Sequence, residues 1–193
     1  MQKLTEGKLL FHGSYISIPE IDLLKCNNGL DFGKGFYVTS SYEQAMNFVP
    51  NSVRKNIRSG RIPADFPIED GQISIYRYHA KPELATYLFE AADNKWLHFV
   101  TANRNRDLFP GLLEQFASLD VIGGKIANDR TAATLIAYIS GAYGKPGEAE
   151  TDRFAISRLL PNRLADQFCF KTPKSIQALE FIRSDRYGDI IRT

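Results

Sequence analysis

With 193 residues and a hydrophobic fraction of 44%, the chain is too apolar for a disordered protein and long enough for one packed domain, which we place over residues 1–193. Its net charge of +2 excludes a protein dominated by a polyanionic partner. The chain has two cysteines without metal-ligand spacing, which predict neither a disulfide framework nor a metal site. We see no signal-peptide core and no membrane-spanning run. We therefore expect a cytoplasmic protein, or one delivered into a target cell by a signal-free route.

Apolar periodicity and turn residues divide the chain into strands and helices. Residues 72–78 alternate as in a half-buried strand, and residues 128–143 carry a helical apolar stripe. Ser40 or Ser41, and Asp93, are helix-capping residue types. In the first half of the chain we expect a strand over 8–12, a glycine-rich turn and strand over 29–39, a helix from about 42 to 50 and a mobile connection over 54–71. Strands over 72–78 and 85–89 and a helix led by Asp93 should follow. In the second half we expect a strand over 119–122, helices over 128–143 and 149–160, a strand over 166–172 and a helix over 173–182. This mixture predicts an α+β fold.

The segment 31–48 is the most informative about function. Its glycines allow a tight turn and a close approach of a ligand to the backbone. In the short strand that follows, alternation places Phe36 and Val38 on one face and Tyr37 on the other. Tyr37 on the strand and Phe48 on the next helix are then positioned to face one cleft. Taken alone, the segment also fits a core strand with a buried tyrosine.

Three segments, in this order, resemble the NAD-binding core of the ADP-ribosyltransferases. Residues 12–14 (His-Gly-Ser) match the first motif, residues 33–48 match the second, and Gln167 falls where the third motif has a Glu. The resemblance is to the diphtheria-toxin and poly(ADP-ribose)-polymerase branch with its His-Tyr-Glu triad, and it is closest to a bacterial family of uncharacterised domains grouped with these enzymes. It covers nearly the whole chain. It implies a split β core of two small, mostly antiparallel sheets with flanking helices.

The resemblance also implies how NAD⁺ is held by the first two motifs. The backbone N–H and C=O of Gly13 would bind the carboxamide, and Gly35 would let the backbone approach the ligand. His12 would donate a hydrogen bond to the adenosine-side ribose, and Ser14 would support the same wall. For His12, a structural histidine at a strand end is the alternative.

Two aromatic residues would sandwich the nicotinamide ring. Tyr37 would stack on one face and Phe48 on the other, which cation–π attraction to the pyridinium favours. The family often has Tyr at the position of Phe48. It often has Ser at the position of Ala45, so the loss of that hydroxyl implies a weaker grip on the carboxamide or a replacement from elsewhere. The alternative is that both rings are core aromatics.

Gln167 is the main departure from the family pattern. The family's Glu accepts a hydrogen bond from the nicotinamide ribose and helps activate an acceptor hydroxyl, whereas an amide supplies neither charge nor a base. We therefore expect His12, Tyr37 and Gln167 to support transfer of single ADP-ribose units rather than polymer formation. Carboxylates that could substitute are Glu43, Asp129 and Asp166, although alternation turns Asp166 away from Gln167. For Asp129, the alternative is that Asn128 or Asp129 caps a helix. Arg104 fits either a solvated side chain or a site for an anion.

Three functions fit these residues. The first is a mono-ADP-ribosyltransferase that modifies a protein or nucleic acid as a bacterial toxin, effector or phage-conflict protein, with an antitoxin or immunity partner and no membrane. The second is a catalytically silent NAD-binding or interaction module that has lost the Glu. The third is an NAD glycohydrolase, in which water is the acceptor. The sequence favours the first, because the cleft motifs are retained.

Overall fold

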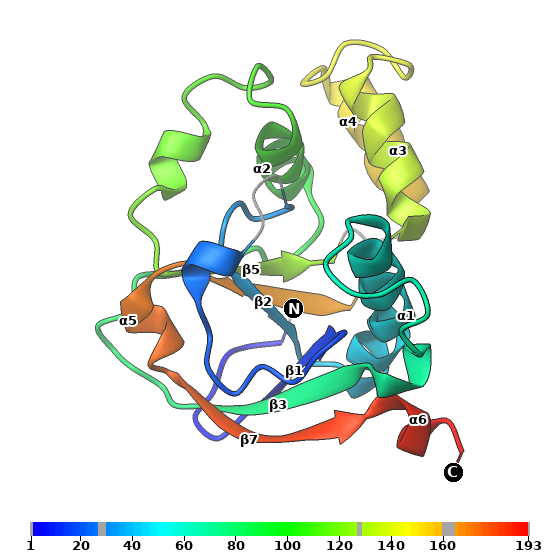
Figure 1. Ribbon diagram of the computed structural model, residues 1–193. Coiled ribbons are helices and arrows are strands. Elements are labelled where there is room, and N and C mark those ends of the chain that lie inside the picture. Colours follow the sequence, from blue (N-terminus) through cyan, green and yellow to red (C-terminus); the bar gives the residue numbers. More distant parts are fainter. Residues whose placement is uncertain (1, 27–29, 127–128, 160–164, 193) are drawn as a thin grey trace.

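The computed structural model describes residues 2–26, 30–126, 129–159 and 165–192. It is an α+β structure built on one seven-stranded sheet in the order β4-β5-β6-β2-β1-β3-β7, antiparallel except for the β4–β5 pair (Figure 1). The strands are β1 (Leu9–Ser14), β2 (Phe36–Thr39), β3 (Gln72–Tyr78), β4 (Thr86–Leu88), β5 (Val121–Lys125), β6 (Asp166–Phe170) and β7 (Leu179–Arg186). The α+β class is therefore confirmed, with one continuous sheet.

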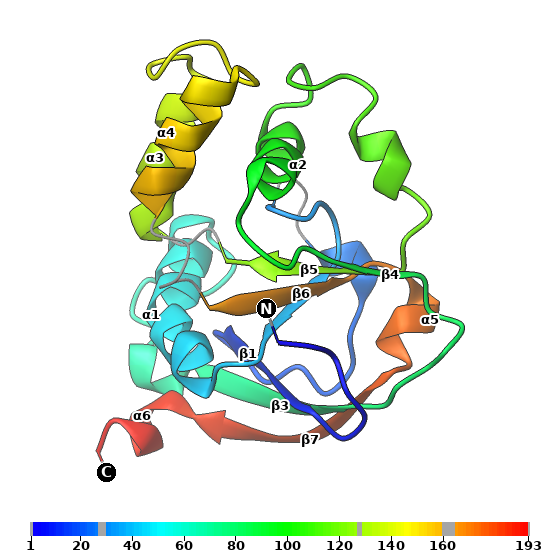
Figure 2. The same ribbon diagram turned by 180° about the vertical axis from the view of Figure 1, so that it is seen from behind.

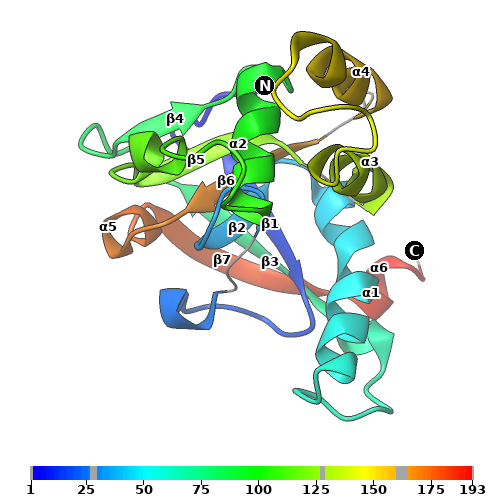
Figure 3. The same cartoon turned by 90° about the horizontal axis from the view of Figure 1, so that it is seen from above.

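The helices gather mainly on one side of the sheet. They are α1 (Tyr42–Arg58), α2 (Asn94–Arg104), α3 (Asp129–Ile139), α4 (Ala149–Leu159), α5 (Pro173–Ile176) and α6 (Tyr187–Ile190), with short 3₁₀ turns η1 (Leu23–Lys25), η2 (Ile68–Asp70) and η3 (Leu113–Phe116). Figures 2 and 3 show α3 and α4 side by side next to α2, while α1 runs along the other half of the sheet. Among the described residues, no helix is long and apolar enough to cross a membrane.

Both faces of the sheet are buried, which fixes the orientation of each strand. On the helix face, Tyr37 and Cys169 pack with α2 residues, and Phe11 packs with α1 residues. On the opposite face, Phe36 and Val38 pack against the loop before η1 and against α5. The predicted alternation of Phe36 and Val38 against Tyr37 is therefore confirmed.

The two central strands β1 and β2 are joined at one residue pair. β2 pairs with β6 along its whole length, and β1 pairs with β3 along its whole length. Between β1 and β2, only Phe11 and Thr39 are paired. From that pair toward the end of β1 and the start of β2, the described residues of the two strands are not paired, and we call this unpaired stretch the seam. It divides the sheet into the groups β4-β5-β6-β2 and β1-β3-β7.

The helix predicted to end at Pro50 continues to Arg58, so this prediction was wrong. A proline inside a helix removes one hydrogen bond and costs about 3 kcal/mol. Here the turns after Pro50 bury Val53 against the sheet, and this burial opposes the cost. The predicted mobile connection over 54–71 is consequently helical in its first part.

The helix predicted over 173–182 was also wrong in extent. It ends at Ile176, and residues 179–186 form the edge strand β7. Pairing with β3 along its length outweighs the local helical pattern, which began correctly with a Thr172 capping box and Pro173. Similarly, β5 continues through Gly123 and Gly124 instead of ending before them. Gly29, Asn128 and Leu160, at predicted element ends, lie outside the described residues.

Candidate functional site

The glycine-rich turn before β2 is held by Tyr37 and by α2. The Phe32 N–H donates to the Tyr37 hydroxyl at 2.9 Å, and that hydroxyl donates to the Gly33 carbonyl at 2.6 Å. The Arg104 guanidinium, at the end of α2, donates twice to one Asp31 carboxylate oxygen, at 2.9 and 2.6 Å. The turn is thus fixed by Tyr37, which follows it closely in the sequence, and by Arg104, which is distant in the sequence. Arg104 is committed to Asp31, which answers the question that the sequence left open.

The ring of Tyr37 is part of the core that the helix face buries. It stacks on Phe32 with ring centroids 6.3 Å apart, and its strand partner across the ladder is Cys169. Burial raises the pKa of the Tyr37 hydroxyl, so this group stays protonated at neutral pH. The protonated hydroxyl can therefore donate its hydrogen bond to the Gly33 carbonyl.

His12 bridges the seam. Its Nδ1 lies 2.6 Å from the Tyr37 carbonyl oxygen, which can only accept, so Nδ1 carries the proton. Burial lowers the pKa of the imidazole, which is therefore neutral at pH 7, with Nε2 as an acceptor. Its ring lies on Phe36, at 4.6 Å between centroids. Sequence comparison implied a donor to ribose, whereas this imidazole offers an acceptor for a ribose hydroxyl.

Gly13 is required by helix packing as well as by any ligand. A Cβ at this position would overlap the Ala45 carbonyl of α1. The Tyr78 N–H donates to the Lys8 carbonyl, and the β1–β3 register is regular from there. Because hydrogen-bonded pairs alternate in an antiparallel ladder, the N–H and C=O of Gly13 point away from β3, toward the seam.

Gln167 lies on β6, in a row that crosses the sheet at the closed end of the seam. It faces Thr39 on β2 and Gly124 on β5, and Thr39 in turn faces Phe11 on β1. This register places Gln167 on the helix face, together with Tyr37, whereas alternation places His12 on the opposite face. The structure thus brings His12 and Tyr37 together directly. Within the described part of the chain, Gln167 makes no hydrogen bond with either of them.

The remaining predicted ligand contacts surround the seam. Phe48 is on α1, one turn after Ala45, and is 48% exposed, although α1 buries its other side. Ala45 and Ser14 are buried. A Cβ on Gly35 would meet the Cys169 sulfur and the Phe170 carbonyl, so this glycine is needed for strand packing. Tyr37 and Phe48 are not among the ring pairs in contact in the described chain.

Neither Glu43 nor Asp166 is hydrogen-bonded to Gln167 in the described structure. Glu43 is exposed on α1. Asp166 points to the opposite face, where Lys125 Nζ lies 2.8 Å away and the Gln2 N–H donates at 2.6 Å. The side chain of Asp129 lies outside the described residues. Across residues 2–26, 30–126, 129–159 and 165–192, no cluster of three or more His, Cys, Asp or Glu side chains is arranged to hold a metal.

A buried polar network links α2, α3 and α4, and the sequence analysis missed it. Asp152 is 1% exposed and accepts from the Tyr138 hydroxyl at 2.5 Å, and His98 Nε2 lies 2.6 Å from its other oxygen. The His98 ring in turn stacks on Phe109 at 4.2 Å. The spacing of Tyr138 and Asp152 on two successive helices was the available signal. His98 thus has a structural role, between Asp152 and Phe109.

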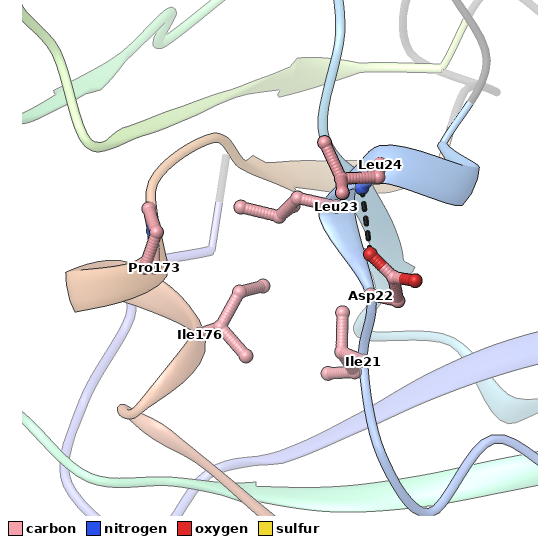
Figure 4. A pocket seen from close by; sticks show the side chains of 6 residues that line it. All are labelled: Ile21, Asp22, Leu23, Leu24, Pro173 and Ile176. Atoms are coloured by element: carbon pink, nitrogen blue, oxygen red, sulfur yellow. Dashed lines mark hydrogen bonds between the residues drawn. The ribbon is translucent and has the colours of Figure 1, made fainter.

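Neither of two surface cavities, one beside η1 and one beside η3, is lined by His12, Tyr37 or Gln167. The first, of about 410 Å³, lies between η1 and α5 and is mainly apolar. Figure 4 shows the one charged residue among its described lining, Asp22, accepting from the Leu24 N–H at 2.9 Å. Because Asp22 is occupied in this way, the hollow offers little polar chemistry. The second, of about 490 Å³, lies between the glycine-rich turn, the end of α2 and η3.

Comparison with known proteins gives a family but no function. A family model described as a protein of unknown function (DUF3990) matches residues 9–181, and the chain therefore belongs to this family. No curated protein and no solved structure matches the chain.

Proposed function

We propose that this member of the DUF3990 family binds NAD⁺ at the seam and transfers single ADP-ribose units to a macromolecular acceptor. The observation that carries the proposal is the seam itself. There, His12 bonds the Tyr37 carbonyl, and Gly13 directs its N–H and C=O into the seam. A donor and an acceptor on one residue match a carboxamide, which has one of each.

The seam also supports a split-core interpretation of the sheet. We propose that β4-β5-β6-β2 and β1-β3-β7 correspond to the two sheets of the ADP-ribosyltransferase core, here still joined through Phe11 and Thr39. The unpaired stretch beyond that pair would admit a ligand between the strands. Phe48 is exposed on α1, the helix whose Ala45 and Val49 pack on Gly13, and would supply an aromatic surface for the cationic nicotinamide ring.

In the proposed reaction, the bond between the ribose C1′ and the nicotinamide nitrogen breaks, and its electron pair leaves with nicotinamide. The acceptor forms a new bond to C1′ and loses a proton. Positive charge builds on the ribose as the bond breaks. His12 Nε2 would accept a hydrogen bond from a hydroxyl of the adenosine-side ribose. The Gln167 amide oxygen, on the helix face of the sheet, would accept one from the nicotinamide ribose and so hold that sugar in place. Gln167 cannot take up the acceptor's proton, so the acceptor must already be nucleophilic, as a nucleobase nitrogen or a carboxylate is.

The resemblance of the three sequence motifs to those of the ADP-ribosyltransferases would make the protein a bacterial toxin, effector or phage-conflict protein with a neutralising partner. The target is identified by incubating the protein with NAD⁺ labelled in the adenosine moiety and with separate protein, DNA and RNA pools. Label on one pool, with an equal amount of nicotinamide released, is the expected result. Nicotinamide release without label would indicate a glycohydrolase, and binding without release would indicate a silent module.

Phe48→Ala tests the site with little risk to the fold, because the side chain is 48% exposed. We expect NAD⁺ to bind about 3–30-fold more weakly, the loss of one cation–π contact of about 0.5–2 kcal/mol. The matched control is Phe154→Ala, at a similarly exposed phenylalanine (43%) on α4, away from the seam. Equal NAD⁺ affinity in both variants and the parent would remove Phe48 from the site. Tyr37→Ala is a poorer test, because Tyr37 also holds the glycine-rich turn.

Gln167→Ala tests the third motif. We expect nicotinamide release to fall more than NAD⁺ affinity, because a hydrogen bond to the ribose matters most as charge builds. Gln167→Glu should keep or raise nicotinamide release while transfer stays confined to single units. Unchanged release in Gln167→Ala would show that this residue takes no part in the reaction.

A further inference from the structure

The 490 Å³ cavity on the helix face is built from three segments that are far apart in the sequence. Lys34 comes from the glycine-rich turn, Arg106 from the segment after α2, and Lys171 from the end of β6. Its volume falls in the range typical of small-ligand sites. It is separate from the seam, because none of the residues proposed to bind NAD⁺ lines it.

Positive charge converges on this cavity. Its lining holds three cations and a single carboxylate, Glu114, so two positive charges are in excess. Lys34 and Arg106 are exposed and, within the described chain, have no carboxylate in ion-pair range. Lys171 lies deeper, and its Nζ donates to the Phe116 carbonyl at 3.4 Å, which leaves two of its three donors for a ligand. A phosphate dianion would balance the excess charge.

The walls of the cavity are aromatic and fixed. Phe99, Phe109 and Phe116 line it, and Phe109 is the only described non-glycine residue with a positive φ, at 54°. Bulky residues rarely adopt this backbone conformation, and such strain collects at ligand sites. The Phe109 ring stacks on His98, which Asp152 holds in turn, so the wall is preorganised for a flat partner.

The turn that carries Lys34 is equally fixed. Its neighbour Gly33 accepts from the Tyr37 hydroxyl, and Asp31 is clamped by Arg104. A ligand would therefore meet cations and rings that already hold their places. We propose that this cavity binds a nucleoside monophosphate, with the base against the partly exposed Phe109 ring and the phosphate among Lys34, Arg106 and Lys171.

The test uses the full chain and titration calorimetry with AMP, GMP, CMP and UMP, and with adenosine and inorganic phosphate separately. We expect at least one nucleotide to bind at least about tenfold more tightly than either fragment, because it makes both the ring contacts and the charged contacts. Lys34→Gln and Arg106→Gln should each weaken binding about 3–10-fold, the loss of one partly exposed charged contact. The matched controls Lys55→Gln and Arg58→Gln, exposed on α1, should leave it unchanged.

The proposal is overturned if no nucleotide binds more tightly than phosphate, or if the α1 controls weaken binding as much as Arg106→Gln does. It is also overturned if His12→Gln abolishes binding while Arg106→Gln does not, because the nucleotide would then lie in the seam. Saturating NAD⁺ should not displace the nucleotide. Nucleotide binding that persists in the presence of saturating NAD⁺ shows that the two sites are separate. A protein that fails to bind NAD⁺ would still be able to bind the nucleotide.

Discussion

Removing the Tyr37 hydroxyl should loosen the turn before β2 while leaving the ring in place. In Tyr37→Phe, the buried Phe32 N–H and the Gly33 carbonyl lose their partner, at 2.9 and 2.6 Å respectively. A buried backbone group left without a hydrogen bond costs about 1–3 kcal/mol, and water can reach the half-buried Gly33, so we expect a loss of about 2 kcal/mol in the free energy of unfolding. In a domain of this size, that loss corresponds to a fall in Tm of roughly 4–8 °C.

Equilibrium unfolding in urea measures this change, and we expect a lower midpoint with an unchanged m value. Amide exchange at Phe32 should also become faster, because its N–H is no longer bonded. The control is Tyr87→Phe, since Tyr87 packs in the same aromatic cluster and its hydroxyl makes no hydrogen bond within the described residues. If Tyr37→Phe and Tyr87→Phe unfold at the same urea concentration, the hydroxyl does not hold the turn.

Three further predictions concern titration and packing. Hydrogen bonds that His79 donates to Glu180 and Glu6 raise its pKa, so its NMR titration midpoint should lie above about 6.5 and fall in Glu180→Gln. The stability that His79 adds is complete below pH 6.5 and is lost as pH rises through the raised pKa. Burial lowers the pKa of His12, so acidification from pH 6.5 toward that lower pKa should destabilise the fold. In His12→Gln, the urea unfolding midpoint should depend less on pH over this range. Gly124→Ala would place a methyl group 3.0 Å from two aromatic rings and should cost about 1–3 kcal/mol, and an unchanged urea midpoint would contradict the packing described for β5.

Sequence reasoning succeeded where local signals and tertiary packing agree. The helix capped by Asp93, the strand over 72–78 and the alternation around Tyr37 all follow from side-chain periodicity, and the structure has each of them. It failed at Pro50 and over residues 179–186. There, distant burial and pairing with β3 outweigh the local preference of the residues.

The candidate site shows the same division. The resemblance to the ADP-ribosyltransferase core implies that His12 and Tyr37 lie on neighbouring strands, and β1 and β2 are neighbours in the sheet. Periodicity within one strand could not show that Gln167 and His12 lie on opposite faces of the sheet, because that depends on the register of three strands. The partner of Arg104 is likewise 73 residues away, and no local pattern announces it.

β6 comes from residues 166–170, yet it fills the centre of the sheet between β5 and β2. A chain still emerging from the ribosome therefore presents the inner edges of β5 and β2 unpaired until most of it has been made. Such open edges are templates for pairing with other chains. Truncation anywhere between β5 and β6 should consequently yield an aggregating polypeptide, which would be cleared from the cell, rather than a partly active fragment.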